Sequence, residues 1–139
     1  MESTLKTIAI LLISLLFIGN SLADDEKEQQ QDQEPEHITY VDMQPSFVSN
    51  LRGGPKYIRC DIQLMTKYAS NVPEIEVHMP ALRHAILMLL AGADGKKLLM
   101  PSGKEALRGK ALDAVNKMLE ELSGKARVQE LYFTAYYVK

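Results

Sequence analysis

Two stretches of the chain, Thr39–Leu51 and Tyr57–Met65, alternate between apolar and polar residues, which predicts two half-buried strands. Pro45 has no amide hydrogen to donate, so we expect the first strand to lie at a sheet edge or to carry a bulge there. Gly53 and Gly54 stand between the two runs and predict a hairpin. The residues expected to share the inner side of the two strands are Val41, Met43, Pro45, Phe47, Leu51, Ile58, Cys60, Ile62 and Leu64.

The segment His78–Gly92 has a different pattern, with no charged residue from Ala85 to Ala91. A surface helix shows one apolar stripe, whereas this segment is apolar on all sides. It is too short to span a bilayer, which takes about 20 apolar residues. The pattern therefore predicts a central helix that is buried all round, with Arg83 and His84 at its entrance.

Capping and breaking residues predict where this helical region begins and ends. Asn71 is the expected N-cap, and Glu74 three residues later completes a capping box. Pro80 cannot lie in an undisturbed helix interior, so either one helix kinks there or a second helix begins there. Gly92 is the expected end. The stretch from Gly92 to Lys97 resembles a phosphate-binding loop only faintly, and we interpret it as a connector because it follows a helix.

A second helix is predicted from the capping box Ser102–Glu105 to Gly124, about five turns later. Lysine, arginine and acidic residues fill its other face, so the helix is amphipathic. Its apolar stripe consists of Leu107, Ala111, Val115, Met118, Leu119 and Leu122.

The last predicted element is a strand at Val128–Val138. We expect Leu131, Phe133, Ala135 and Tyr137 on one side and Tyr132, Thr134, Tyr136 and Val138 on the other. Both sides are largely apolar, which favours a central place in the sheet. The order of elements predicts an α+β domain with a small antiparallel or mixed sheet and two to three helices on one face. The helical crossover is expected to be right-handed if it joins parallel strands.

Charge divides the chain into an acidic leader and a basic domain. The segment Asp24–Glu36 carries seven acidic residues and one lysine, a net charge of −6, and has no apolar residue. Such a segment cannot bury enough surface to order itself and is expected to be a solvated linker. The alternative is a low-affinity autoinhibitory tail that folds back onto the basic domain. The remainder, His37–Lys139, carries fourteen basic and ten acidic residues, a net charge of +4. This surplus is far below that of a nucleic-acid-binding protein, and tryptophan is absent.

The N-terminal stretch Met1–Ala23 admits two interpretations. The apolar run Thr7–Ile18 followed by small residues predicts a secretory signal peptide that is cleaved after Ala23. The alternative is an uncleaved signal anchor, because the 17 residues Thr7–Ala23 are only just long enough to span a membrane. Both interpretations place residue 24 onward outside the cytoplasm. The predicted organisation is thus residues 1–23, a linker over 24–36 and a domain over 37–139.

Candidate chemistry is sparse. The single cysteine, Cys60, occupies an inner strand position and is expected to be a small buried hydrophobe, with a reactive or intermolecular thiol as the alternative. The histidines His78 and His84 are six residues apart across Pro80, which does not place both on one helical face, and we predict no metal or cofactor site. No nucleophile and base are paired in a known catalytic motif, so an enzyme is not expected.

Five basic residues stand out as a candidate surface. They belong either to an ordinary solvated helix face or to a site for lipid headgroups or an acidic protein partner. These residues are Lys96, Lys97, Lys104, Arg108 and Lys110.

Several stretches, in order, resemble the flagellar basal-body-associated FliL family over about residues 39–139. Three stretches carry the resemblance: Tyr40–Leu51 (YVDMQPSFVSNL), Tyr57–Met65 (YIRCDIQLM) and His78–Leu90 (HMPALRHAILMLL). Pro101–Ala111 and Val128–Val138 support it. Each motif alone would be weak, and their coincidence makes the resemblance specific.

The resemblance implies a domain like the stomatin/prohibitin homology fold, held by a single-pass inner-membrane protein on the periplasmic side of the flagellar basal body. It also implies a homo-oligomeric ring around the motor stator and a role in supporting or regulating rotation, chemotaxis, swimming and swarming. No catalysis or cofactor is implied. Family members usually carry a cytoplasmic tail and a clear spanning helix, whereas this chain has a short, marginal N-terminal segment, so a soluble periplasmic variant is an alternative. A second hypothesis is a periplasmic or membrane-surface binding module of another envelope complex.

Overall fold

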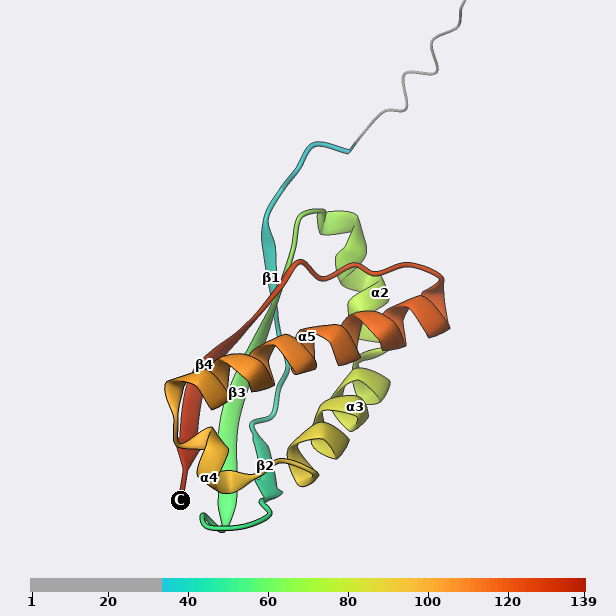
Figure 1. The fold of residues 1–139 in the computed structure, drawn as a ribbon. Coiled ribbons are helices and arrows are strands. Elements are labelled where there is room, and N and C mark those ends of the chain that lie inside the picture. The colour runs from blue at the N-terminus through green and yellow to red at the C-terminus, as the bar shows by residue number, and fades with distance from the viewer. Residues whose placement is uncertain (1–33) are drawn as a thin grey trace, which may run out of the picture. The chain divides into compact units, whose positions relative to one another are not determined.

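Strand β3 (Tyr57–Thr66) is the centre of a four-stranded sheet in the computed structural model, which describes residues 34–139 (Figure 1). Strands β1 (Thr39–Asp42) and β2 (Phe47–Asn50) pair one after the other with one edge of β3. Strand β4 (Glu130–Val138) pairs with the opposite edge. All three pairings are antiparallel, so the predicted small antiparallel sheet is confirmed, and the rule for parallel crossovers does not apply.

The predicted first strand is divided into β1 and β2 by the segment around Pro45. The Gln44–Pro45 peptide bond is cis, and both short strands lie at the sheet edge, as expected for a proline-containing run. The predicted hairpin joins β2 to β3 through Gly53 and Gly54, whose φ angles are 64° and 68°. Glycine adopts this left-handed conformation without the strain that a side chain would add.

The inner side of β3 is fully covered. Ile58, Cys60, Ile62 and Leu64 are each at most 2% exposed, which confirms the predicted alternation. The helices lie on this side of the sheet (Figure 1). The residues of β3 that stand between these four in the sequence therefore face the open side. The sheet therefore has one buried and one open face, as the α+β architecture requires.

Strand β4 differs from its prediction in two ways. It is an edge strand, because β3 separates it from β1 and β2. A register shift then places Ala135 opposite Asp61 but Phe133 opposite Ile62, which leaves Thr134 as an extra residue. The predicted alternation is wrong beyond this bulge. The residues on the helix side are Leu131, Phe133, Tyr136 and Val138, opposite the inner residues of β3.

The helical part begins with the 3-10 turn Ala69–Asn71 and the short helix α2 (Val72–Val77). The predicted capping box is wrong, because the side chain of Asn71 makes no cap hydrogen bond. Its Nδ2 donates to the Thr66 hydroxyl at 2.9 Å and its Oδ1 accepts from Arg127 at 3.1 Å. The amide group of Asn71 is therefore hydrogen-bonded to Thr66 and Arg127 and does not cap the helix.

Helix α3 (Met79–Ala91) has Pro80 in its first turn, so the second of the two alternatives for this proline is confirmed. The prediction that the helix is buried all round is wrong. Only Leu82, Ile86 and Leu90 are buried, at steps of four residues, whereas Met88 is 57% exposed. The helix has neighbours on one side only, and its apolar outer residues are left partly in solvent.

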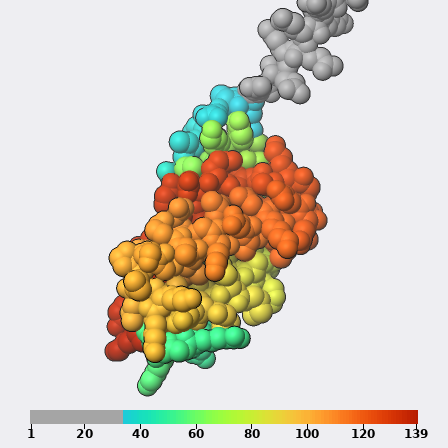
Figure 2. Space-filling model, viewed as in Figure 1, coloured from blue at the N-terminus to red at the C-terminus, as the bar shows by residue number. Residues whose placement is uncertain are grey.

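Helix α5 (Pro101–Ser123) packs across the sheet and against α3 (Figures 1 and 2). The predicted inner stripe is confirmed at its centre, where four residues are buried, and Gly124 ends the helix with a φ of 74°. Leu122, expected in the stripe, is 47% exposed. The capping box at Ser102 is wrong, because the helix already begins at Pro101 and Met100 is its N-cap. The buried residues of the stripe are Leu107, Ala111, Val115 and Leu119.

The described residues before β1 contact the domain at the turn after β3. The Glu34 carboxylate accepts hydrogen bonds from the backbone amide and the hydroxyl of Ser70. Lys67 Nζ lies 3.0 Å from Glu36 Oε1. The predictions for residues 1–23, including cleavage after Ala23, and for most of the 24–36 linker lie outside the described residues.

Candidate functional site

The five basic residues singled out in the sequence lie on two helices. Lys96 and Lys97 belong to a short helix, α4 (Gly95–Leu98), which the sequence analysis treated as a connector. Lys104, Arg108 and Lys110 lie in the N-terminal half of α5. The side chains of these five residues reach three different surroundings.

Lys104 and Arg108 are one helical turn apart and are tied to strand β4. Arg108 donates to Glu105 at 2.9 Å and to Glu130 at 2.7 Å, so it links α5 to the start of β4. The hydrogen bond to Glu105, more than the one to Glu130, raises the pKa of the Arg108 guanidinium. Lys104 Nζ lies 5.0 Å from the ring centroid of Tyr136, within the range of a cation–π contact. Arg108 is thus engaged in holding the fold together.

Lys97 and Lys110 instead lie beside a groove of about 420 Å³ between the end of α3, α4 and α5. The groove has a mainly apolar lining, to which Met88, Leu89 and Leu107 contribute. Gly103 lets α5 approach α4 closely here, because a Cβ at this position would overlap the carbonyl oxygen of Lys97 and lie 2.6 Å from its carbonyl carbon. The groove is a fixed feature of the packing, with a cationic side chain on two of its walls.

Lys96 projects toward the turn between β2 and β3. A Cβ added at Gly54 would lie 2.7 Å from Lys96 Cγ, so the lysine stem covers this glycine. Asp94 caps α4 by accepting from the Lys96 amide at 2.9 Å. The lysine is therefore placed by the cap at the end of the molecule that carries the hairpin turn.

Sequence reasoning missed two exposed apolar residues beside these lysines. Leu99 is 61% exposed and Met100 is 58% exposed, in the turn that joins α4 to α5. The signal was present in the sequence, because an apolar pair follows Lys96 and Lys97 directly. It was overlooked because the pair belongs to no helical or strand period.

The cysteine and the histidines offer no reactive arrangement. Cys60 is fully buried, and burial, with a smaller effect of the neighbouring Asp61 carboxylate, raises the pKa of its thiol to about 12. His78 Nε2 lies 3.7 Å from Glu74, one turn earlier, whereas His84 is exposed on α3. Within residues 34–139, no three histidine, cysteine or acidic side chains are grouped as metal ligands would be.

Between Glu34 and Lys139, no helix is both long enough and apolar enough to cross a bilayer.

Comparison with known proteins adds the family. Residues 40–138 match the family described as "Flagellar basal body-associated protein FliL", a range that contains nearly the whole sheet and every helix that the structure describes. The chain is also similar to the "Flagellar protein FliL" of Aquifex aeolicus (strain VF5), with 25% identity over 107 residues. That alignment covers 76% of this chain and 64% of the relative, so the chain spans somewhat less than two thirds of the relative's length. The chain belongs to the FliL family of flagellar basal body-associated proteins.

Proposed function

We propose that this protein is a non-catalytic accessory component of the flagellar motor, which associates with the stator and supports or regulates rotation. Chemotaxis, swimming and swarming would depend on it through the motor. The observation that carries the proposal is the family match over residues 40–138, a range that includes both sides of the sheet and all the helices between Glu34 and Lys139. The buried, unreactive state of Cys60 is consistent with a protein that acts by contact rather than by chemistry.

The proposed location is the periplasmic side of the inner membrane, at the basal body. The secretory character of Met1–Ala23 supports export of the domain. If this segment is retained it anchors the protein, and if it is cleaved after Ala23 the protein is a soluble periplasmic component. Mass spectrometry of the mature N-terminus distinguishes the two, because a first residue of Asp24 excludes the anchor.

The proposed assembly is a homo-oligomeric ring around the stator. Strand edges are the natural contacts, because their unpaired amide and carbonyl groups invite a further strand. The edge formed by Tyr40–Leu51 and the outer edge of β4 both lie at the margins of the sheet.

Cross-linking through introduced cysteines tests this assembly in the full chain. Val48, which is 59% exposed on β2, and Glu121, exposed on α5, are suitable positions. Cys60 will not compete, because it is buried. A ladder of cross-linked species from a Val48→Cys, Glu121→Cys variant supports contact between the strand edge and the last helix. A product that remains monomeric in intact cells would remove this interface.

Deletion of the gene tests the function itself. We expect slower swimming and reduced swarming with an unchanged growth rate, and fewer stator units at each motor. Restoring the full chain should restore all three motility readouts. Unchanged stator occupancy and unchanged swimming in the deletion strain would contradict the proposal.

A second candidate is a membrane-surface module of another envelope complex. It is favoured by Lys96 and Lys97 beside the exposed residues Leu99 and Met100. The two candidates separate readily, because a module of another complex predicts normal motility in the deletion strain and a gene neighbourhood without flagellar genes.

A further inference from the structure

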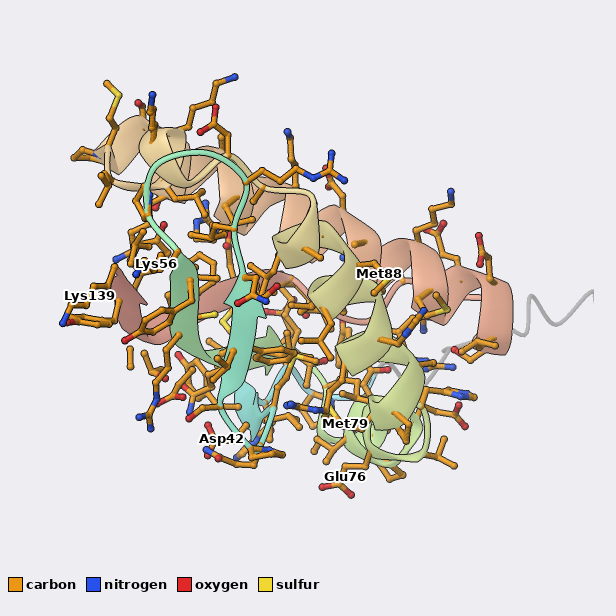
Figure 3. All side chains as sticks on the ribbon, turned by 90° about the horizontal axis from the view of Figure 1, so that it is seen from below. Asp42, Lys56, Glu76, Met79, Met88 and Lys139 are labelled. Carbon is orange, nitrogen blue, oxygen red and sulfur yellow. The ribbon has the colours of Figure 1, made fainter. Side chains whose placement is uncertain are left out.

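One end of the domain is built from three segments that are distant in sequence. The turn between β2 and β3 is hydrogen-bonded to the loop before α4, since Arg52 N donates to Ala93 O at 3.0 Å and Gly95 N donates to Arg52 O at 2.8 Å. Lys56 N donates to the backbone oxygen of Lys139 at 2.7 Å, at the end of β4, and Figure 3 shows the two side chains at the same end. In Figure 2 the green turn, the yellow-orange α4 region and the red end of β4 form the lower end of the domain.

The backbone of the turn between α4 and α5 is equally fixed. Leu98 is only 5% exposed and anchors α4 in the core. Met100 N donates to Lys97 O at 3.0 Å, and Lys104 N donates to Met100 O at 3.0 Å. Leu99 and Met100 are therefore held outward by an ordered backbone, with more than half of each residue in solvent.

The same end carries a concentrated positive charge. Leu51–Lys56 and Ala93–Lys104 together contain five basic residues and one acidic residue, a net charge of +4. The acidic residue, Asp94, already accepts a hydrogen bond from the Lys96 amide. We call this surface the basic tip; it consists of Arg52, Lys56, Lys96, Lys97, Leu99, Met100 and Lys104.

We infer that the basic tip docks on an anionic lipid bilayer, with Leu99 and Met100 entering the headgroup region and the surrounding cations contacting lipid phosphates. Lysine and arginine near an anionic membrane each strengthen binding about fivefold. Projecting apolar side chains with flanking lysines are the chemistry of an interfacial anchor.

The shape of the tip favours a bilayer over an acidic protein segment. Two hollows border the tip, the groove beside Lys97 and Lys110 and one of about 440 Å³ that Lys56 and Lys139 help to line, and neither has Leu99 or Met100 in its lining. The apolar pair instead projects from a turn, as insertion into a planar surface requires. This inference does not depend on a flagellar role, so its failure and that of the proposed function are separate outcomes.

The test uses residues 34–139, which form one compact unit and contain every core residue that the structure describes. The chain has no tryptophan, so Leu99→Trp places a single fluorescent reporter in the tip. Vesicles with about 30% phosphatidylglycerol in phosphatidylcholine serve as the anionic probe, and pure phosphatidylcholine vesicles serve as the neutral one. We expect a blue shift and vesicle co-sedimentation with the anionic probe only, weakened by raising the salt from about 0.05 M to about 0.5 M.

Two pairs of substitutions distinguish the contribution of positive charge to vesicle binding from the contribution of apolar insertion. Lys96→Gln with Lys97→Gln should weaken binding about 25-fold, and Leu99→Ser with Met100→Ser should weaken it at least about tenfold. The controls are Val77→Ser, at a position 67% exposed on α2, and Lys117→Gln with Lys125→Gln, all away from the tip. These should bind as the parent does. Thermal unfolding followed by circular dichroism verifies that every variant is folded.

Three results would overturn the inference. The first is no binding of the parent fragment to anionic vesicles. The second is an equal loss of binding in the control variants, which would indicate general attraction of a cationic protein. The third is binding that needs Lys96 and Lys97 but tolerates serine at Leu99 and Met100, with no blue shift of the tryptophan at 99; this would point to an acidic protein partner.

Discussion

Helices α3 and α5 show how differently two apolar patterns are used in one domain. From Ala85 to Ala91 helix α3 has no charged residue, yet it buries only three residues along its length. Helix α5 carries charges on most turns and buries four. Three of the 13 residues of α3 and four of the 23 residues of α5 are buried, so the far more apolar helix buries only a slightly larger share of its residues.

An apolar pattern therefore predicts which residues a helix could bury, whereas the neighbouring elements determine which of them are buried in the fold. Helix α3 packs on β2 and α5, and no other described element covers its outer side. Its surplus apolar residues, such as Leu89, therefore line the groove or lie partly exposed. Such surplus is common at surfaces where other molecules bind.

The largest expected effect on the free energy of unfolding comes from the buried side of α3, and the exposed side of the same helix provides the control. Ile86→Ala removes a side chain that is fully buried and should lower the free energy of unfolding by about 2–5 kcal/mol, because it leaves a cavity. Met88→Ala, on the exposed side of the same helix, should change it by less than about 0.5 kcal/mol. Urea unfolding measures both. Equal losses in the two variants would contradict the one-sided burial of α3.

The next largest effect on stability is expected at Gly103 of α5, and Gly109 on the same helix serves as the comparison. Gly103→Ala should destabilise the fold by about 2–3 kcal/mol, because the new Cβ would overlap the Lys97 carbonyl group. Gly109 has nothing within 4 Å of such a Cβ. Gly109→Ala should therefore stabilise the helix by about 0.5–1 kcal/mol, since alanine loses less backbone entropy. The thermal unfolding midpoint should fall in Gly103→Ala and rise in Gly109→Ala. Shifts in the same direction would show that the α4–α5 contact is looser than described.

A smaller effect is expected for Arg83, which joins α3 to the sheet. Its Nη1 donates to the carbonyl oxygens of Met43 and Pro45 at 2.6 and 2.7 Å, and its guanidinium carbon lies 4.1 Å from the Phe47 ring centroid. Arg83→Met should cost about 1–2 kcal/mol, because both carbonyl groups lose a charged donor.

His84→Ala is the matched control for Arg83→Met, since His84 is the exposed neighbour on the same helix. It should change the free energy of unfolding by less than about 0.5 kcal/mol. If Arg83→Met also left the free energy of unfolding unchanged, the hydrogen bonds of Arg83 would not contribute to the attachment of α3 to the sheet.

The smallest effect at neutral pH concerns Cys60, in the layer of the sheet that both helices cover. Its folded pKa is raised to about 12 from a usual value of 9.0, so its contribution is complete below pH 9 and is lost as the pH rises toward 12. Between pH 9 and pH 10 we expect about 1 kcal/mol of additional loss relative to Cys60→Ala. Parallel pH profiles of unfolding for the two proteins would contradict this.

Much of the fold could be predicted because local pattern and tertiary environment agree. The alternation of β3 and the central stripe of α5 each repeat long enough to define one buried side. The glycine pair at the hairpin and Gly124 act through backbone conformation, which needs no tertiary partner.

The errors arose where a distant part of the chain decides the outcome. The Asn71 side chain is used by Thr66 and Arg127 rather than as a cap. The bulge at Thr134 shifts which residues of β4 face the core, and α4 is too short to show a helical period. The candidate basic residues were identified, but only the folded chain separates Arg108, bound to two glutamates, from Lys96 and Lys97 at the tip.

We propose that this domain works at the flagellar motor through contacts with other proteins. The most direct test is the position in living cells of the full chain fused after Lys139 to a fluorescent protein that matures outside the cytoplasm. We expect foci that coincide with a basal-body marker at most motors, and their loss or weakening in a strain without stators. A fusion protein of normal stability that is spread evenly along the envelope, with no enrichment at basal bodies, would contradict the proposed role.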